Sequence, residues 1–286
     1  MLNTMLVEDS SSCRHVFKKR ARKFLELSVA NLSAVVLSLI IGLGTPSGAR
    51  ADEAYARSRL KAMSDYMAAQ KTVSFDFDAT LEVITTDSQR LALVSSGTIR
   101  MRRPDKIHIM RAMGFADMEI LFDGKTFTVL DKIANLYAQV DVPGTIDHVI
   151  GELRSKYNRP FPGADLLESN VYDVLMTDVE NVKDLGSGVI GGVECDYFAF
   201  RAKEVDWEIW IADGKRPYPC QFIITSKLVT GSPQYSYRLR DWKTGDKASA
   251  DDFRFRNPKN AKKTDLKNLL DTMDELPKNF VRGGAK

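Results

Sequence analysis

Apolar and polar residues alternate along most of the chain, and this alternation predicts antiparallel strands. It is clearest at 195–226, where three aromatic-rich runs are separated by turn residues such as Asp213-Gly214. Aromatic and β-branched residues at a period of two, bounded by glycine and proline, are typical of a meander. Their parity predicts one apolar face shared by Phe198, Phe200, Trp207, Ile209, Ile211, Phe222 and Ile224. A slip of one residue would turn this set to the other face, so the register is well specified.

The same alternation recurs on both sides of this meander. Residues 73–83 alternate strictly, with Phe75 and Phe77 on the apolar face, and 91–101 continue the pattern through Ile99. Further strands are predicted at 107–111, 118–122, 126–130, 136–140, 179–189, 234–242 and 253–255. Near-regular spacing without intervening helices favours an antiparallel sheet over βαβ units. The sequence therefore predicts a mainly β domain.

A few helices accompany the sheet. They are predicted at 52–70, 146–153 and 164–176, with a short one in the tail through Leu266, Leu269, Leu270 and Met273. In the first, Leu60, Met63 and Met67 follow the spacing of one helical face. A methionine-rich face is typical of ordinary core, although methionine also suits a helix that covers an adaptable cavity.

The first 51 residues have the pattern of a cleaved signal peptide. Basic residues between Arg14 and Lys23 precede an apolar run at 28–43, and Ala49-Arg50-Ala51 follows. This pattern predicts cleavage before Asp52 and export to the periplasm. The apolar run is shorter than the roughly 20 residues that cross a bilayer, which favours cleavage over the alternative of a retained anchor. The remainder divides into a domain at 52–260 and a polar tail at 261–286.

The leader also explains the basic composition. The 286 residues include 41 Lys and Arg and 38 Asp and Glu. Residues 1–51 contain seven of the basic and three of the acidic residues, which leaves 34 and 35 in the exported part. A nearly neutral exported chain carries no electrostatic footprint of a nucleic-acid partner, so we expect none.

Two cysteines, Cys195 and Cys220, follow the leader. An even count in an exported chain keeps a disulfide open as an alternative. The predicted register nevertheless places the two side chains on opposite faces and on strands separated by a third, about 10 Å apart. Because this separation is too large for a bridge, the sequence predicts two free, buried thiols.

Local motifs for catalysis are missing. His108 and His148 are the histidines after the leader, and neither lies near a cysteine or a paired carboxylate in sequence. The chain has no G-x-S-x-G, H-E-x-x-H or C-x-x-C motif and no glycine-rich phosphate loop. We therefore expect a protein that is not an enzyme and has no metal or cofactor, with a hydrolase of scattered residues as the weakest alternative.

Four stretches together resemble the periplasmic lipoprotein-carrier superfamily (LolA/LolB-like). They are 97–107 (GTIRMRRPDKI), 122–127 (FDGKTF), the meander 207–224 and 252–258 (DFRFRNP). Their order spans most of 52–260. The segments 164–176 and 195–200 look more like a relative described as a predicted periplasmic domain of unknown function.

The resemblance implies an antiparallel half-barrel of about eleven strands, with helices covering an apolar concave face. In the carriers this cavity takes the acyl chains of lipoproteins, and the arginine before the proline, here Arg103, holds the lid helices shut. The alternative is that Arg103 is a solvated charge at the rim of the sheet. The carriers have phenylalanine where this chain has Ile107, which departs from their pattern.

We therefore expect a monomeric periplasmic protein that holds lipid or acyl chains. The expected ligand-binding residues are Phe75, Phe77, Ile99, Ile107, Trp207, Ile209, Ile211, Phe222 and Ile224. Two alternatives stay open. The same fold could serve as a sensor or structural module that binds an envelope protein, and the apolar face could be filled core with no cavity.

Overall fold

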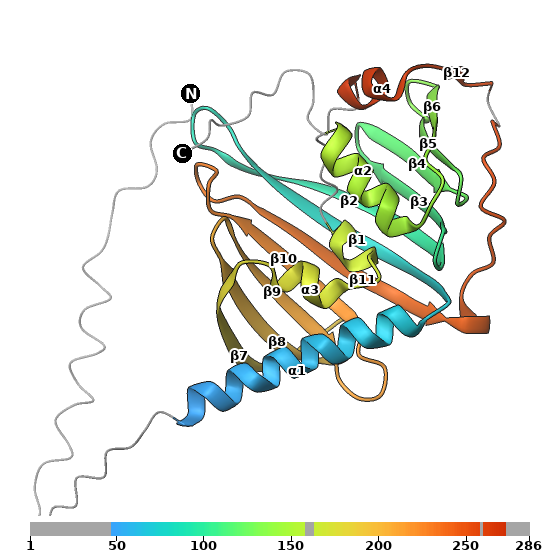
Figure 1. Ribbon diagram of the computed structural model, residues 1–286. Helices are drawn as coiled ribbons and strands as arrows, with labels where there is room; N and C mark the ends of the chain where they lie inside the picture. Colours follow the sequence, from blue (N-terminus) through green and yellow to red (C-terminus); the bar gives the residue numbers. More distant parts are fainter. Residues whose placement is uncertain (1–46, 158–162, 258–259, 273–286) are drawn as a thin grey trace, which may run out of the picture. The chain divides into compact units, whose positions relative to one another are not determined.

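The computed structural model describes residues 47–157, 163–257 and 260–272 (Figure 1). The expected signal peptide lies outside these residues except for 47–51, which belong to the first helix, α1 (Ser47–Ala69). Within the described part of the chain, no helix combines the length and apolar character needed to span a membrane.

The described strands form a single sheet of twelve. They are β1 (Thr72–Ile84), β2 (Arg90–Arg102), β3 (Lys106–Met113), β4 (Ala116–Phe122), β5 (Thr126–Asp131), β6 (Leu136–Asp141), β7 (Val179–Ile190), β8 (Val193–Ala202), β9 (Val205–Ala212), β10 (Pro219–Ser226), β11 (Gln234–Thr244) and β12 (Lys262–Lys263). Their order is β12-β6-β5-β4-β3-β2-β1-β11-β10-β9-β8-β7. The expected half-barrel is confirmed, with one refinement: the short strand β12 adds a parallel pairing with β6 to an otherwise antiparallel sheet.

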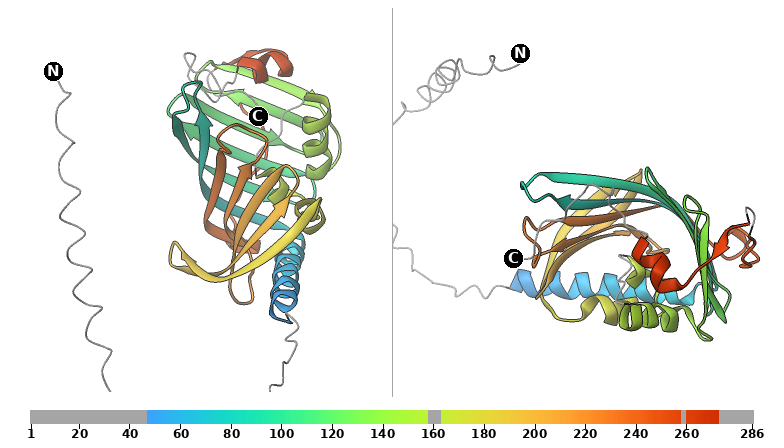
Figure 2. Two further views of the ribbon diagram at one scale, coloured as in Figure 1. Left: turned by 90° about the vertical axis from the view of Figure 1, so that its left-hand side faces the viewer. Right: turned by 90° about the horizontal axis from the view of Figure 1, so that it is seen from above.

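Helices cover the concave side of the curved sheet (Figure 2). They are α1, α2 (Ile146–Tyr157), the 3-10 helix η2 (Ala164–Leu167) and α3 (Val171–Met176). On α1, the residues Ala56, Leu60, Met63 and Met67 are buried and form the predicted apolar face. This face packs toward β7 and β9.

The predicted helix at 164–176 is divided into η2 and α3. Glu168, which follows η2, has the extended angles φ −66° and ψ 161°. The carboxylate of Asp147 accepts hydrogen bonds from the backbone N–H (3.0 Å) and the hydroxyl of Ser169. Because these contacts replace the helical partner of the Ser169 N–H, the chain bends between the two pieces.

The predicted register of the central meander is confirmed. Phe198 lies opposite Ile209 and Phe200 opposite Trp207, and Ile209 in turn lies opposite Phe222. The Phe200 and Trp207 rings stack with centroids 3.8 Å apart. Cross-strand aromatic pairs of this kind stabilise one pairing of the strands, which explains why alternation identified the register correctly.

The predicted separation of the two cysteines is wrong. Both thiols are free and buried, as expected, but their Sγ atoms lie 2.7 Å apart. The pairing of β10 with β9 shifts between Pro219 and Gln221, and this bulge turns Cys220 to the face that carries Cys195. The small side chain of Ala212 packs with both cysteines. Simple alternation could not reveal the bulge.

The expected strand at 253–255 is also wrong. The segment carries no strand; Phe253 has a positive φ of 55°, and its N–H donates to Asp251 Oδ1 at 2.6 Å. Asp251 Oδ2 lies 2.6 Å from His108 Nδ1, while His108 Nε2 lies 2.9 Å from Glu119 Oε1. Burial alone lowers the pKa of His108, but its hydrogen bonds to the two carboxylates raise it overall. This polar cluster fastens the segment to the sheet.

The short helix expected in the tail is present as α4 (Leu266–Thr272). Leu266, Leu269 and Leu270 are buried in the same core as the sheet residues, while Met273 lies outside the described residues. The helix packs against β6, beside β12 (Figure 1). The described part of the tail is therefore joined to the main sheet.

Candidate ligand-binding cavity

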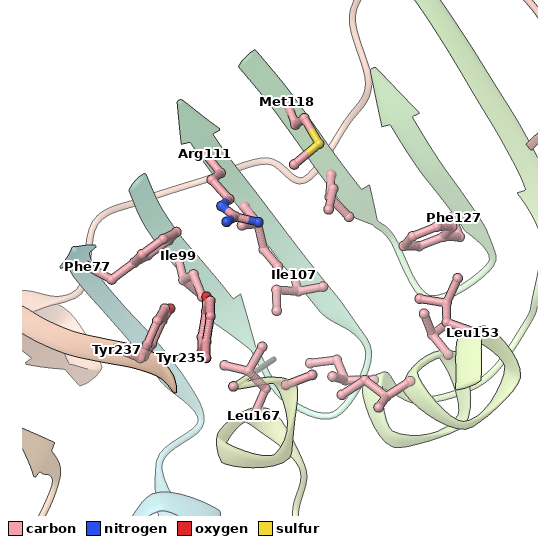
Figure 3. Close-up of a pocket in the computed structure, with 17 residues that line it drawn as sticks. Phe77, Ile99, Ile107, Arg111, Met118, Phe127, Leu153, Leu167, Tyr235 and Tyr237 are labelled. Atoms are coloured by element: carbon pink, nitrogen blue, oxygen red, sulfur yellow. The ribbon is translucent and has the colours of Figure 1, made fainter. Parts of the chain in front are cut away.

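An apolar cavity of about 100 Å³ lies between the concave face of the sheet and the helices α2 and η2 (Figure 3). Its walls come from β1 to β5, β11 and these helices. The lining residues are Phe77, Ile99, Ile107, Ile109, Arg111, Met118, Ile120, Phe127, Ile146, Val149, Ile150, Leu153, Gly163, Ala164, Leu167, Tyr235 and Tyr237. Arg111 is the one charged side chain among them.

The strand side of the cavity follows directly from alternation. Ile107, Ile109 and Arg111 are alternate residues of β3, so their side chains share the concave face. Beside them, Gly97 of β2 lets the ring of Phe77 and the backbone of β3 lie close to its own backbone. A Cβ on Gly97 would lie 2.1 Å from the backbone oxygen of Met110 in β3 and 2.5 Å from the ring of Phe77, so a side chain there would clash with both.

The helix side of the cavity forms a lid of two pieces, α2 and η2. The lid residues of α2 recur at helical spacing, and they are Ile146, Val149, Ile150 and Leu153. Gly163 precedes η2 with φ +84°, a conformation that favours glycine, and Ala164 follows it. These two small residues line the cavity, and a Cβ on Gly163 would lie 3.8 Å from the ring of Tyr237, in ordinary contact with it.

The cavity is small for a ligand pocket. Pockets for small molecules usually measure about 300–1,000 Å³, and an engineered apolar cavity of about 150 Å³ holds one benzene. A space of about 100 Å³ therefore accommodates only part of a lipid while the lid is in this position. The alternative of an entirely filled core nevertheless does not hold for this part of the sheet.

The structure divides the nine residues expected to bind ligand into two groups. Phe77, Ile99 and Ile107 line the cavity. The other six lie outside its lining, in or against the packed core, and they are Phe75, Trp207, Ile209, Ile211, Phe222 and Ile224. Alternation within β3 could have added Ile109, but nothing local in the sequence indicates Tyr235 and Tyr237, which β11 brings from the other side of β1.

Arg103 lies at the turn after β2 and reaches the lid. One terminal nitrogen of its guanidinium donates to the backbone carbonyl of Glu168, just after η2, at 3.2 Å. Its own backbone N–H donates to the carbonyl of Lys71 at 2.9 Å, which anchors it to the start of the sheet. Burial lowers the pKa of Arg103, and the nearby carboxylate of Asp147 opposes this shift.

Other polar contacts join the two pieces of the lid. Arg154 of α2 forms ion pairs with Asp165 of η2 and with Glu168, the latter at 2.7 Å. Burial raises the pKa of both carboxyl groups, and the positive charge of Arg154 opposes the shift. The lid is thus fastened by a handful of polar contacts at its edge, while its inner surface is apolar.

The site offers little for bond-making chemistry. Its lining combines aliphatic and aromatic side chains with two phenols and one guanidinium. Among the described residues, no three His, Cys, Asp or Glu side chains form a group that could hold a metal ion. What this arrangement can do chemically is bury apolar surface and contact one anionic or polar group.

Several solved structures have a similar fold at low sequence identity. The Mycobacterium tuberculosis lipoprotein LppX is 13% identical, with a TM-score of 0.44, over 70% of this chain and 98% of that chain. LprF from Mycobacterium bovis is 12% identical, with a TM-score of 0.40, over 68% and 98%. The LolA superfamily protein NE2245 from Nitrosomonas europaea is 11% identical, with a TM-score of 0.34, over 70% and 97%.

A search among curated proteins gave no match to the sequence. A family model does match, over residues 56–267, and its description is "Predicted periplasmic protein (DUF2092)". This range runs from α1 into α4 and so includes the sheet, the lid and the cavity. The expected likeness to a predicted periplasmic family of unknown function is confirmed, and the chain belongs to the DUF2092 family of predicted periplasmic proteins.

Proposed function

We propose that this protein is a periplasmic, non-enzymatic carrier or binder of an apolar ligand, a lipid or an acyl chain. The observation that supports it most is the apolar cavity under a separately fastened lid. Moving apolar surface out of water releases about 25 cal/mol per Å², so such a cavity can retain an acyl chain without any chemistry. The predicted signal peptide and the family description support the periplasmic location.

Binding a whole acyl chain requires the lid to move. Two hydrogen bonds fasten it to the turn after β2, one from Arg103 to the Glu168 carbonyl and one from the Ile146 N–H to the Pro104 carbonyl (2.9 Å), while Asp147 and Ser169 join its two pieces to each other. Water can replace each of these bonds, and their net contribution is about 1–3 kcal/mol each. These polar contacts oppose opening only moderately, and an entering acyl chain would replace the apolar contacts of the buried lid residues. Arg103 acts in this proposal as the clasp that closes the lid.

The predicted residues outside the cavity have a supporting role in this proposal. Phe75 stacks on Trp242, with centroids 5.3 Å apart, and Trp207 stacks on Phe200. These side chains pack in the core outside the cavity lining. They therefore support the wall of the cavity and do not contact a ligand while the lid is closed. A chain that enters deeper would meet Phe75 first, since Phe77 of the same strand lines the cavity.

The test is whether bound lipid depends on the cavity. Native mass spectrometry of the protein purified from the periplasm should detect a co-purified lipid. Ala164→Leu places a larger side chain in the cavity and should lower lipid occupancy at least about tenfold, because forcing extra methylenes into occupied space costs about 1–3 kcal/mol. Ala92→Leu, the same change at an exposed position of β2, should leave occupancy unchanged.

Two results would contradict the proposal. Protein without any bound lipid that also fails to bind added fatty acid or phospholipid would leave a sensor or structural module as the better explanation. Equal lipid occupancy in Ala164→Leu and Ala92→Leu, with both variants folded, would place the lipid elsewhere on the molecule.

A further inference from the structure

One residue does not fit a purely apolar site. Arg111 lies on the concave side of β3 and is the one charged side chain among the 17 residues drawn around the cavity (Figure 3). Most of the concave face is buried against helices, and the residues before Arg111 on this face of β3, Ile107 and Ile109, are apolar, so a half-buried arginine among them is unexpected. Its presence in the lining calls for a functional explanation.

The surroundings of Arg111 fix the orientation of its guanidinium. Nε donates to the hydroxyl of Ser95 at 3.1 Å, and Ser95 is buried. With Nε held in this way, the end of the side chain extends over the cavity, on the side of Phe77 and Ile99 (Figure 3). Gly97, directly opposite Arg111 in β2, has no side chain that would obstruct it.

The nearby phenols add hydrogen-bond donors at the same end. Tyr235 and Tyr237 of β11 also line the cavity, and both are buried. Burial raises the pKa of Tyr237 well above its usual value, although the positive charge of Arg111 opposes the shift. The Tyr237 hydroxyl therefore stays protonated at neutral pH, next to a positive charge.

The opposite end of the cavity is apolar. Ile107, four residues before Arg111 on β3, lies about 13 Å away at about 3.3 Å per residue. Around this end lie Phe127 and the lid residues Ile146 and Leu153. The cavity thus has a positively charged end and an apolar end, which is the complement of an amphiphile with a negative headgroup.

We propose that Arg111 is the headgroup-binding residue of this cavity and that the ligand is an acyl chain with an anionic headgroup, a carboxylate or a phosphate. This inference rests on the proposed function and narrows its ligand class. A guanidinium presents a rigid fork of donors that matches both oxyanions, and charge-assisted hydrogen bonds of this type are about twice as strong as neutral ones. A neutral lipid of equal chain length gains nothing from Arg111.

Ligands of one chain length and different headgroups provide the test. Titration calorimetry, below the micellar concentration, would compare dodecanoate, dodecyl phosphate and dodecanol. The wild-type protein should bind the two anions at least about tenfold more tightly than dodecanol, as one charge-assisted hydrogen bond provides. Tighter binding of dodecanoate would indicate a fatty acid as the source of the headgroup, and tighter binding of dodecyl phosphate would indicate a phospholipid.

Variants of Arg111 locate the preference. Arg111→Met should abolish the preference for anions and leave the affinity for dodecanol unchanged, so dodecanol also reports that the cavity is intact. Arg111→Lys keeps the charge without the fork and should retain part of the preference. Arg238→Met removes the same charge from an exposed position on the convex side of β11 and should change none of the affinities.

The possible failures are distinguishable. If wild-type protein binds all three ligands equally and Arg111→Met does the same, the headgroup inference is wrong while the proposed function stands. If Arg111→Met loses dodecanol and dodecanoate together, while Arg111→Lys restores both equally, Arg111 supports the fold and not a headgroup. If wild-type protein binds none of the ligands, the proposed function itself fails.

Discussion

The two halves of the sheet use the concave face differently. Under α1, strands β8 to β10 contribute a filled core in which Phe198, Ile209 and Phe222 have almost no exposed surface. Under α2 and η2, strands β2 to β5 leave a cavity of about 100 Å³. Both halves show the same alternation in sequence, so alternation identifies the buried face but does not determine whether that face is filled.

The covering helices make the difference. Leu60, Met63 and Met67 of α1 are fully or almost fully buried, and methionine adapts its shape to the gaps between aromatic rings. On the other half, the lid brings the small residues Gly163 and Ala164 to the wall. The long side chains of α1 fill their half, and the two-piece lid with its two small residues leaves a space.

The largest effect is expected from the filled half. Trp207→Ala removes a ring that stacks on Phe200 and meets Phe222 edge to face, and it should lower the free energy of unfolding by about 3–5 kcal/mol. The matched pair Ile209→Ala and Ile109→Ala compares the packing of the filled half with that of the cavity half. Ile209→Ala should cost about 2–5 kcal/mol, whereas Ile109→Ala should cost below about 2 kcal/mol, because a residue at a cavity wall loses fewer contacts.

Urea denaturation of the three variants measures these differences. Ligand retention provides the second readout, since Ile109→Ala should change the amount of bound lipid and Ile209→Ala should not. Equal costs for the two isoleucine variants would mean that both halves are equally well packed, and the contrast between them would disappear.

The sequence was a reliable guide where local rules decide the structure. The alternation from Phe198 to Ile224 predicted both faces and the register, because cross-strand packing enforces that alternation. It failed at Cys220 and at Phe253. In both places one residue breaks the extended pattern, through a bulge in the first case and through a positive φ stabilised by Asp251 in the second.

The candidate site was harder to predict than the fold. Phe77, Ile99 and Ile107 were identified because their own strands alternate. Arg111 was missed because a charged residue in an alternating strand is ordinarily assigned to neither core nor ligand. The lid residues could not be found, since their position depends on how α2 and η2 cross the sheet, and such long-range contacts have no local signal.

A smaller effect is expected from the two thiols of the filled half. The Sγ atoms of Cys195 and Cys220 are 2.7 Å apart, and the hydrogen bond between them lowers the pKa of Cys195, while the same hydrogen bond and burial raise the pKa of Cys220. Because both thiols are buried, a small oxidant is needed: hydrogen peroxide should oxidise Cys195 to a sulfenic acid, and the Cys220 thiol should then displace water from it to form a disulfide. The bond should raise stability by about 2–4 kcal/mol.

Thiol alkylation in denaturant measures the outcome. Reduced protein should give two alkylated cysteines in the exported chain, and oxidised protein none, with a mass lower by two hydrogen atoms. Cys195→Ser should prevent the stabilisation and otherwise leave the protein folded. Oxidised protein that still shows two reactive thiols would mean that the bulge at Pro219 does not bring the cysteines together.

The smallest effect on stability, and the most specific effect on the cavity half, is expected from Arg103→Leu. The variant loses the hydrogen bond to the Glu168 carbonyl, which lowers the stability of the folded protein. It also removes a charge whose burial is unfavourable, as the lowered pKa of Arg103 indicates, and this change raises the stability. The melting temperature should therefore change little. The rate at which a fluorescent fatty acid leaves the protein should rise about tenfold, because one charge-assisted bond no longer closes the lid.

Arg102→Leu is the matched control for this variant. Arg102 directly precedes Arg103, and its side chain points to the other face of the sheet. Its guanidinium lies over the ring of Phe253, 5.3 Å from the centroid, so it contacts the segment after β11 and not the lid. Its removal should leave the release rate at the wild-type value. Identical release from all three proteins would show that Arg103 does not control the lid, and it would leave the hydrogen bond from the Ile146 N–H to the Pro104 carbonyl as the polar contact that joins the lid to this turn.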